Sequence, residues 1–79
     1  MKLPRGVKGI DLVNYLVRDW DFRVLHQVGS HIMIYTDRPS AYTTTIPAHR
    51  PLKTGTFAGI VKQIAAHKQV TRDQLLRNL

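Results

Sequence analysis

Three short β-rich runs follow one another between two segments of helical periodicity, and this order limits the folds open to the chain. The runs cover residues 22–28, 31–36 and 42–46, separated by Gly29-Ser30 and by the turn-forming residues 37–40. Connections this short join antiparallel neighbours, because parallel strands need a crossover of about a dozen residues or more. The pattern therefore predicts a three-stranded antiparallel sheet.

Apolar residues at helical spacing predict one helix before the sheet and one after it. The first stripe, within residues 7–20, consists of Leu12, Val13, Leu16, Val17 and Trp20. On this pattern Tyr15 faces away from the stripe, together with charged residues. The second stripe follows Thr54, a residue type that caps helices, and consists of Phe57, Ile60, Val61 and Ile64.

The C-terminal segment carries a clear local signal. Thr71 and Gln74 have the spacing of a capping box, and Val70 is placed to contact Leu75 across it. The apolar residues of the short helix predicted here are Leu75, Leu76 and Leu79. Amphipathic helices and a small sheet each need a partner surface, so the helices are expected to cover one face of the sheet. We therefore expect an α+β domain in the order α-β-β-β-α, followed by a short C-terminal helix.

A chain of 79 residues supports one hydrophobic core, because small domains bury only about 60% of their unfolded surface. Hydrophobic residues make up 43% and charged residues 22%, which is the usage of a globular domain. The absence of cysteine excludes disulfides, thiolate zinc sites and cysteine nucleophiles. The sequence has neither a membrane-spanning apolar run nor a signal-like N-terminus. We expect a single domain over residues 1–79, located in the cytoplasm.

Basic residues outnumber acidic ones. Twelve Lys and Arg residues against five Asp give a net charge of +7 with the histidines neutral. Residues 38–72 contain no acidic side chain and six basic ones, namely Arg38, Arg50, Lys53, Lys62, Lys68 and Arg72. A positive potential attracts polyanions. This segment is predicted to form either a surface for nucleic acid or a docking surface for an acidic protein.

His31 is the candidate for acid–base chemistry. If Ile32 and Ile34 point toward the helices, strand alternation sends His31, Met33 and Tyr35 to the other face. An exposed imidazole beside a turn can accept and donate protons at neutral pH, as cleavage of a phosphodiester requires. The alternative is that His31 is simply a polar surface residue.

Several sequence motifs occur along the chain in the same order as in one known protein family. They are Met1-Lys2-Leu3-Pro4-Arg5, Gln27 followed by Gly29-Ser30-His31, Ile46-Pro47-Ala48-His49, and Leu52-Lys53-Thr54-Gly55-Thr56-Phe57 followed by Ile60-Val61-Lys62-Gln63-Ile64. Together they resemble the HicA family of toxins from bacterial toxin–antitoxin pairs, over nearly the whole chain. The chain departs from that family at position 26, where His replaces a frequent Arg. It also departs at Arg50-Pro51, where Gly commonly follows the His of the third motif.

The resemblance implies a fold like the double-stranded RNA-binding domain and a defined activity. The family consists of ribosome-independent endoribonucleases that cleave mRNA, which are held inactive by a HicB antitoxin. Its catalytic histidine corresponds to His31, and the neighbouring turn corresponds to Gly29 and Ser30. Neither a metal nor a small-molecule cofactor is expected.

On this interpretation His31 is the base that activates an RNA 2′-hydroxyl for attack on the adjacent phosphate. Lys53 and the backbone N–H groups of Gly55 and Thr56 are expected to hold phosphate at a helix N-terminus. The further RNA contacts expected are Arg50, Lys62 and His26. His26 and His49 are the candidates for a second proton carrier. The four histidines lack metal-ligand spacing, so no metal site is predicted.

Two other interpretations remain open. The same fold and charge suit a non-catalytic RNA-binding module in which His31 is only a contact. They also suit an interaction protein whose basic surface binds an acidic partner, and such a partner could compete with RNA for one surface. Tyr35 and Tyr42 could stack a base on the open sheet face or be covered there by a partner.

Overall fold

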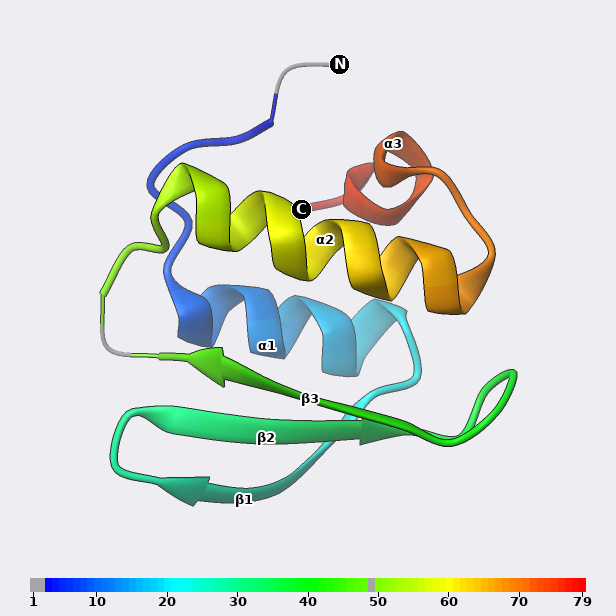
Figure 1. Cartoon of the computed structure of the whole chain (residues 1–79), viewed down its shortest axis with the longest axis horizontal. Helices are drawn as coiled ribbons and strands as arrows, with labels where there is room; N and C mark the ends of the chain where they lie inside the picture. Colours follow the sequence, from blue (N-terminus) through cyan, green and yellow to red (C-terminus); the bar gives the residue numbers. More distant parts are fainter. Residues whose placement is uncertain (1–2, 49) are drawn as a thin grey trace.

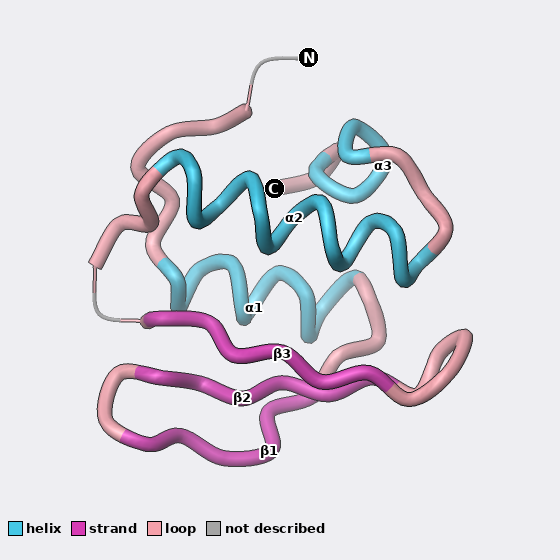
Figure 2. Tube along the Cα trace, viewed as in Figure 1, coloured by secondary structure: helices cyan, strands magenta, loops and turns pink. Residues whose placement is uncertain are grey.

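The structure, a computed structural model, describes residues 3–48 and 50–79. Its elements follow the order α1 (Gly9–Asp19), β1 (Arg23–Val28), β2 (His31–Thr36), β3 (Tyr42–Pro47), α2 (Thr54–Lys68) and α3 (Arg72–Leu76). The strands form one antiparallel sheet in the order β1-β2-β3. The helices lie together beside this sheet (Figure 1; Figure 2). The predicted α+β architecture with three antiparallel strands and a short last helix is confirmed.

Helices cover only one face of the sheet. In β2 the side chains of Ile32, Ile34 and Thr36 are buried, whereas His31 is exposed and Met33 is half-buried. This alternation is that of a sheet with one face on the core and one face open. A single cluster joins the covered face to all three helices: Leu12, Val13, Tyr15, Leu16, Phe22, Ile32, Ile34, Ile46, Leu52, Phe57, Val61, Ile64, Ala65, Leu75 and Leu76.

Tyr15 corrects the predicted stripe of the first helix. It was expected to face solvent, but it is only 3% exposed, whereas Val17 is 41% exposed. The Tyr15 hydroxyl donates a hydrogen bond of 2.6 Å to the carbonyl of Leu75. Trp20 Nε1 donates to the same carbonyl at 3.0 Å. The tyrosine can be buried because α3 supplies a partner for its hydroxyl, a contact between distant parts of the chain.

The Tyr15 hydroxyl is expected to stabilise the attachment of α3. Replacing Tyr15 with Phe removes the buried hydrogen bond to Leu75 and the longer ones that the hydroxyl accepts from Trp20 Nε1 and Asn78 N. It should lower the free energy of unfolding by about 1 kcal/mol, since Trp20 still serves the Leu75 carbonyl. Urea denaturation measures this loss. The matched control Tyr35→Phe, on the open face, should change it by less than about 0.5 kcal/mol. Equal effects of the two substitutions would contradict this role.

The helix ends agree in part with the sequence. The capping box of α3 is confirmed, because Gln74 N donates to Thr71 Oγ1 at 3.0 Å and Thr71 N donates to Gln74 Oε1 at 2.8 Å. Leu79 lies beyond α3 and is 41% exposed, so the prediction that it belongs to this helix is wrong. Thr54 does not cap α2 either, because it is already the first helical residue and Lys53 occupies the N-cap position.

The start of α1 lies directly against the end of β3. A Cβ atom added to Gly9 would stand 1.6 Å from the carbonyl oxygen of Pro47 and 2.9 Å from the Cα of Ala48. Nearby, Leu52 N donates to the Val7 carbonyl at 2.8 Å, and Lys8 pairs with Pro51 in an isolated bridge. The segment before α1 and the loop after β3 are therefore bound to each other. In the described ranges, no helix combines the length and apolarity needed to cross a membrane.

Candidate functional site

The hairpin between β1 and β2 fixes the place of His31. Val28 and His31 are paired, so Gly29 and Ser30 form a two-residue turn. Gly29 has φ 58°, which a residue with a side chain rarely adopts, and it stands where type II′ hairpins carry glycine. Gln27 Nε2 donates a hydrogen bond of 2.8 Å to the Gly29 carbonyl and holds the turn. His31 thus begins β2 with its side chain exposed, as expected.

Ser30 connects this turn to the rest of the fold through its backbone. The Ser30 carbonyl accepts a hydrogen bond of 2.7 Å from Ala48 N, just after β3. On its other side His31 is paired with Pro47 in the sheet. The loop from β3 toward α2 therefore supports the His31 end of the hairpin. The hydrogen bonds of the described residues include none between the Ser30 hydroxyl and His31.

His31 stands at one end of the uncovered sheet face. Paired residues on antiparallel strands point to the same side. The strand register therefore defines the open face as Arg23, His26, Val28, His31, Met33, Tyr35, Thr43, Thr45 and Pro47. None of these positions is acidic, and three of them carry a cationic or titratable nitrogen group. The open face therefore carries positive charge and one tyrosine ring, that of Tyr35.

His26 lies next to His31 on the open face. His26 is paired with Met33 and Val28 with His31, so the two histidines are diagonal neighbours on adjacent strands. Such neighbours lie about 7–8 Å apart along the sheet surface. The His26 side chain is exposed, like that of His31. Both imidazoles can therefore reach one ligand laid on this face.

Arg23 belongs to the open face, and it was missed in the sequence. The Arg23 guanidinium lies over the Tyr35 ring, 4.9 Å from its centroid, in a cation–π contact. The register shifts between Val24 and His26, so Leu25 is an extra residue in β1. This bulge brings Arg23 to the same face as His26 although the two are three residues apart. Strict alternation would have placed them on opposite faces, and no residue type in the run marks the bulge.

Acidic residues border the open face at the end remote from His31. Asp21 and Asp37 line a small pocket together with Arg23 and Tyr35. His31 stands at the other end of β2, beside the Gly29-Ser30 turn. Binding of a polyanion to the open face is therefore favoured at the His31 end and disfavoured beyond Tyr35.

The expected phosphate-holding residues lie at the His31 end of the molecule but in the helix layer. Lys53 precedes α2, and Gly55 and Thr56 belong to its first turn. In Figure 1 the start of α2, the end of β3 and the β1–β2 turn share one end of the molecule. Arg50, in the connecting loop, and Lys53 are both exposed. The structure thus gathers these groups at one end, with His31 on the open face and the start of α2 on the covered side.

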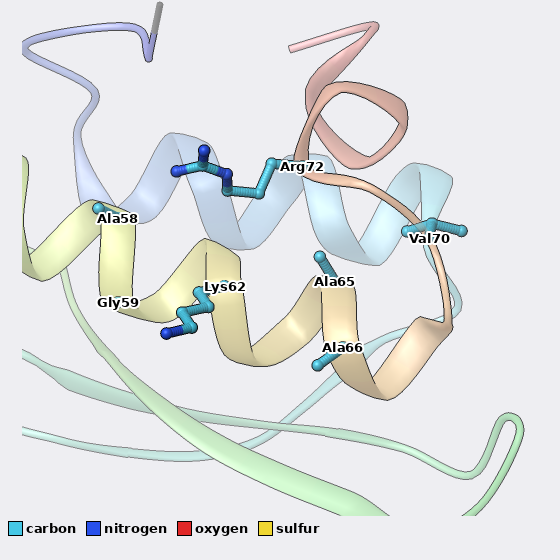
Figure 3. Close-up of a pocket in the computed structure, with 7 residues that line it drawn as sticks. All are labelled: Ala58, Gly59, Lys62, Ala65, Ala66, Val70 and Arg72. Atoms are coloured by element: carbon cyan, nitrogen blue, oxygen red, sulfur yellow. The ribbon is translucent and has the colours of Figure 1, made fainter. Parts of the chain in front are cut away.

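Lys62 lies apart from this end. With Arg72 it lines a groove of about 600 Å³ between α2 and the segment that begins α3. The remaining lining residues are small or aliphatic: Ala58, Gly59, Ala65, Ala66 and Val70. In Figure 3 Arg72 extends toward the Ala58 end of the groove and Lys62 points away from α3. The groove is on the helix layer, so Lys62 is not a neighbour of His31 on the open face.

Lys68, another basic residue of the segment 38–72, has internal partners. Lys68 Nζ donates to Thr36 Oγ1 at 3.0 Å and to the Arg38 carbonyl at 2.8 Å, and it lies over the Phe22 ring. Burial lowers the pKa of Lys68, against the opposing effect of nearby carboxylates. The basic segment 38–72 therefore does not form one continuous cationic face.

Tyr42 is not on the open face. It pairs with the buried Thr36, and its ring stacks on His67 at 4.6 Å between centroids. His67 Nε2 also lies 3.0 Å from the Ser40 carbonyl. Both rings therefore fasten the β2–β3 loop to α2, and Tyr35 alone of the two tyrosines can stack a base from the open side.

Some expectations fall on residues that the structure does not describe. Met1, Lys2 and His49 lie outside the described residues, so the first motif is covered only in part and His49 is not placed. Among the described residues, no three His, Asp or Glu side chains are grouped as metal ligands would be. The chain matches no protein-family model, no curated protein and no solved structure in the comparisons made with them.

Proposed function

We propose that the chain is a metal-independent endoribonuclease, the mRNA-cleaving toxin of a type II toxin–antitoxin pair, as its resemblance to the HicA family implies. The observation that carries the proposal is the position of His31, an exposed imidazole at the end of an uncovered, acid-free sheet face. The order α1-β1-β2-β3-α2 agrees with the double-stranded-RNA-binding-like fold that the same resemblance implies.

The proposed reaction uses the 2′-hydroxyl of the RNA itself. His31 removes the proton from this hydroxyl, and the 2′-oxygen attacks the adjacent phosphorus while the bond to the 5′-oxygen breaks. The products are a 2′,3′-cyclic phosphate and a 5′-hydroxyl end. One acid–base group contributes about 10²–10⁴-fold to such a reaction. The remaining acceleration must come from positioning and from stabilising charge on the phosphate.

Cationic groups on two sides of the His31 end are suited to hold the RNA backbone. On the open face Arg23 and His26 lie along the strand next to His31. Around the edge of the sheet, Arg50 and Lys53 are exposed beside the start of α2. We assign the scissile phosphate to the open face and neighbouring phosphates to Arg50, Lys53 and the N–H groups of Gly55 and Thr56.

A HicB-like antitoxin is the proposed protein partner. The open face includes Val28, which is 68% exposed, and the half-buried Met33. An antitoxin that covers this face would bury these apolar groups and block His31 at the same time. The excess of basic over acidic residues favours an acidic partner surface.

Incubation of the purified chain with RNA in the presence of a metal chelator tests the activity. Cleavage is expected without added metal, and denaturing electrophoresis measures it. A mobility shift on a native gel without any cleavage would overturn the nuclease proposal and favour the non-catalytic RNA-binding module. Neither cleavage nor a shift would favour the third interpretation, an interaction protein.

Tyr35 is expected to stack a base of the bound RNA. Replacing Tyr35 with Ala removes the aromatic surface under Arg23 and should weaken binding of a 2′-O-methyl RNA, which cannot react, about 5- to 100-fold. Tyr35→Phe keeps the ring and should bind within about 3-fold of the wild type, since stacking needs no hydroxyl. Fluorescence anisotropy gives both affinities. Unchanged affinity of Tyr35→Ala would place the RNA elsewhere.

A further inference from the structure

We infer that His26 is the second proton carrier of the site, the general acid that protonates the leaving 5′-oxygen while His31 takes the 2′-proton. This inference rests on the proposed endoribonuclease activity. It arises from the sheet register, because His26 and His31 project from adjacent strands on the same uncovered face. The sequence left the second carrier open between His26 and His49.

The spacing of positions 26 and 31 on adjacent strands suits this reaction. The attacking 2′-oxygen and the leaving 5′-oxygen occupy opposite sides of the phosphorus, so base and acid must approach from two sides. Diagonal neighbours on adjacent strands are about 7–8 Å apart. A phosphate placed between them would be within hydrogen-bond reach of both, about 2.6–3.2 Å from each nitrogen to its oxygen. Both side chains are exposed, so a substrate can enter from solvent.

These two residues account for both proton transfers of the step. Neutral His31 accepts the 2′-hydroxyl proton as the new P–O2′ bond forms. Protonated His26 gives its proton to the 5′-oxygen as the P–O5′ bond breaks. After the step His31 is protonated and His26 is neutral, and exchange with water restores the starting state. No oxidant, metal or co-reactant takes part.

The surroundings of His26 leave it available for this task. On β1 the next open-face charge is Arg23, and on β2 the neighbours facing His26 are His31, Met33 and Tyr35. In the same row β3 contributes Thr45, which carries no charge. No open-face position near His26 carries a carboxylate that could compete with the phosphate. The other described histidine, His67, is bound to Tyr42 and Ser40 on the covered side.

A substrate with a sulfur leaving group separates a general acid from a mere RNA contact. Two RNA oligonucleotides are compared, one natural and one with sulfur in place of the scissile 5′-oxygen, because a thiolate leaves without protonation. His26→Ala should cleave the natural RNA about 10²–10⁴-fold more slowly than the wild type. It should cleave the sulfur-containing RNA within about 10-fold of the wild-type rate. His31→Ala should be slow on both.

The pH dependence gives a second readout. A general acid must be protonated, so the wild-type rate should fall at high pH, and His26→Ala should lose this fall on the natural RNA. His67→Ala, which removes an imidazole from the covered side, is the matched control and should retain the wild-type profile. Affinity for 2′-O-methyl RNA should fall far less in His26→Ala than the rate of cleavage of the natural RNA.

Each possible result of these experiments decides whether His26 is the general acid. If His26→Ala is equally impaired on both substrates, or loses affinity as much as rate, His26 is an RNA contact and the inference is overturned. If His26→Ala cleaves natural RNA at the wild-type rate while His31→Ala does not, the proposed nuclease stands and its acid is another group. If the wild type cleaves neither RNA, the proposed function fails and this role fails with it.

Discussion

Replacing His31 with Ala should lower the rate of RNA cleavage about 10²–10⁴-fold while the protein remains folded. The loss is expected because the imidazole is the proposed base, and the Ala side chain cannot accept a proton. The fold should tolerate the change, since His31 is exposed at the end of the hairpin and substitutions at such sites shift stability by less than about 0.5 kcal/mol. Single-turnover cleavage of an RNA oligonucleotide measures the rate.

His67→Ala is the matched control for this variant. It removes an imidazole from the covered side, at the C-terminal end of α2, and should leave the chemical step unchanged. Affinity for 2′-O-methyl RNA, measured on His31→Ala, should stay within about 3-fold of the wild type, because the other cations of the open face remain. Cleavage by His31→Ala at the wild-type rate would contradict the assignment of the base.

Replacing Gly9 with Ala should have the largest effect on stability. The added Cβ would stand 1.6 Å from the Pro47 carbonyl oxygen, and every close atom belongs to backbone that cannot rotate away. α1 and β3 must separate to admit it, which should lower the free energy of unfolding by about 3 kcal/mol. For a domain of this size such a loss corresponds to a fall in Tm of about 12–24 °C.

Gly59→Ala provides the opposite case with the same substitution. Gly59 lies inside α2, and an added Cβ would meet nothing within 4 Å. The substitution should therefore raise stability by about 0.5–1 kcal/mol, the difference in helix propensity between Gly and Ala. Urea denaturation of the two variants measures both signs. A Gly9→Ala protein as stable as the wild type would show that α1 does not lie against Pro47.

Contacts that are local in the chain could be predicted from the sequence. The Gly29-Ser30 turn and the Thr71 capping box depend on neighbouring residues, and both are present in the structure. The pairing that a two-residue turn imposes also sets His26 beside His31, so this neighbourhood could have been derived from the same turn. The place of His31 at the exposed start of a strand followed from strand alternation alone.

Features that depend on distant partners could not be predicted. The burial of Tyr15 requires the carbonyl of Leu75, which lies 60 residues away in the chain. The Lys68 ammonium group is hydrogen-bonded to partners in β2 and in the loop after it, so it does not extend the cationic surface. The bulge at Leu25, which turns Arg23 onto the open face, has no marker such as glycine in its own segment. The alternation of residues along a strand predicts which face of the sheet a residue lies on only where no bulge interrupts it.

The attack of a single 2′-hydroxyl is tested most directly by an RNA that lacks this group at one cleavage site. In one oligonucleotide the ribose 5′ of a mapped cleavage site is replaced by deoxyribose, and mass spectrometry identifies the ends of all products. Cleavage is expected to disappear at this site alone, and every remaining product of the 5′ side is expected to end in a 2′,3′-cyclic phosphate. Continued cleavage at the deoxyribose would show that water or another nucleophile attacks the phosphate, and the assignment of His31 as the base for the 2′-hydroxyl would be wrong.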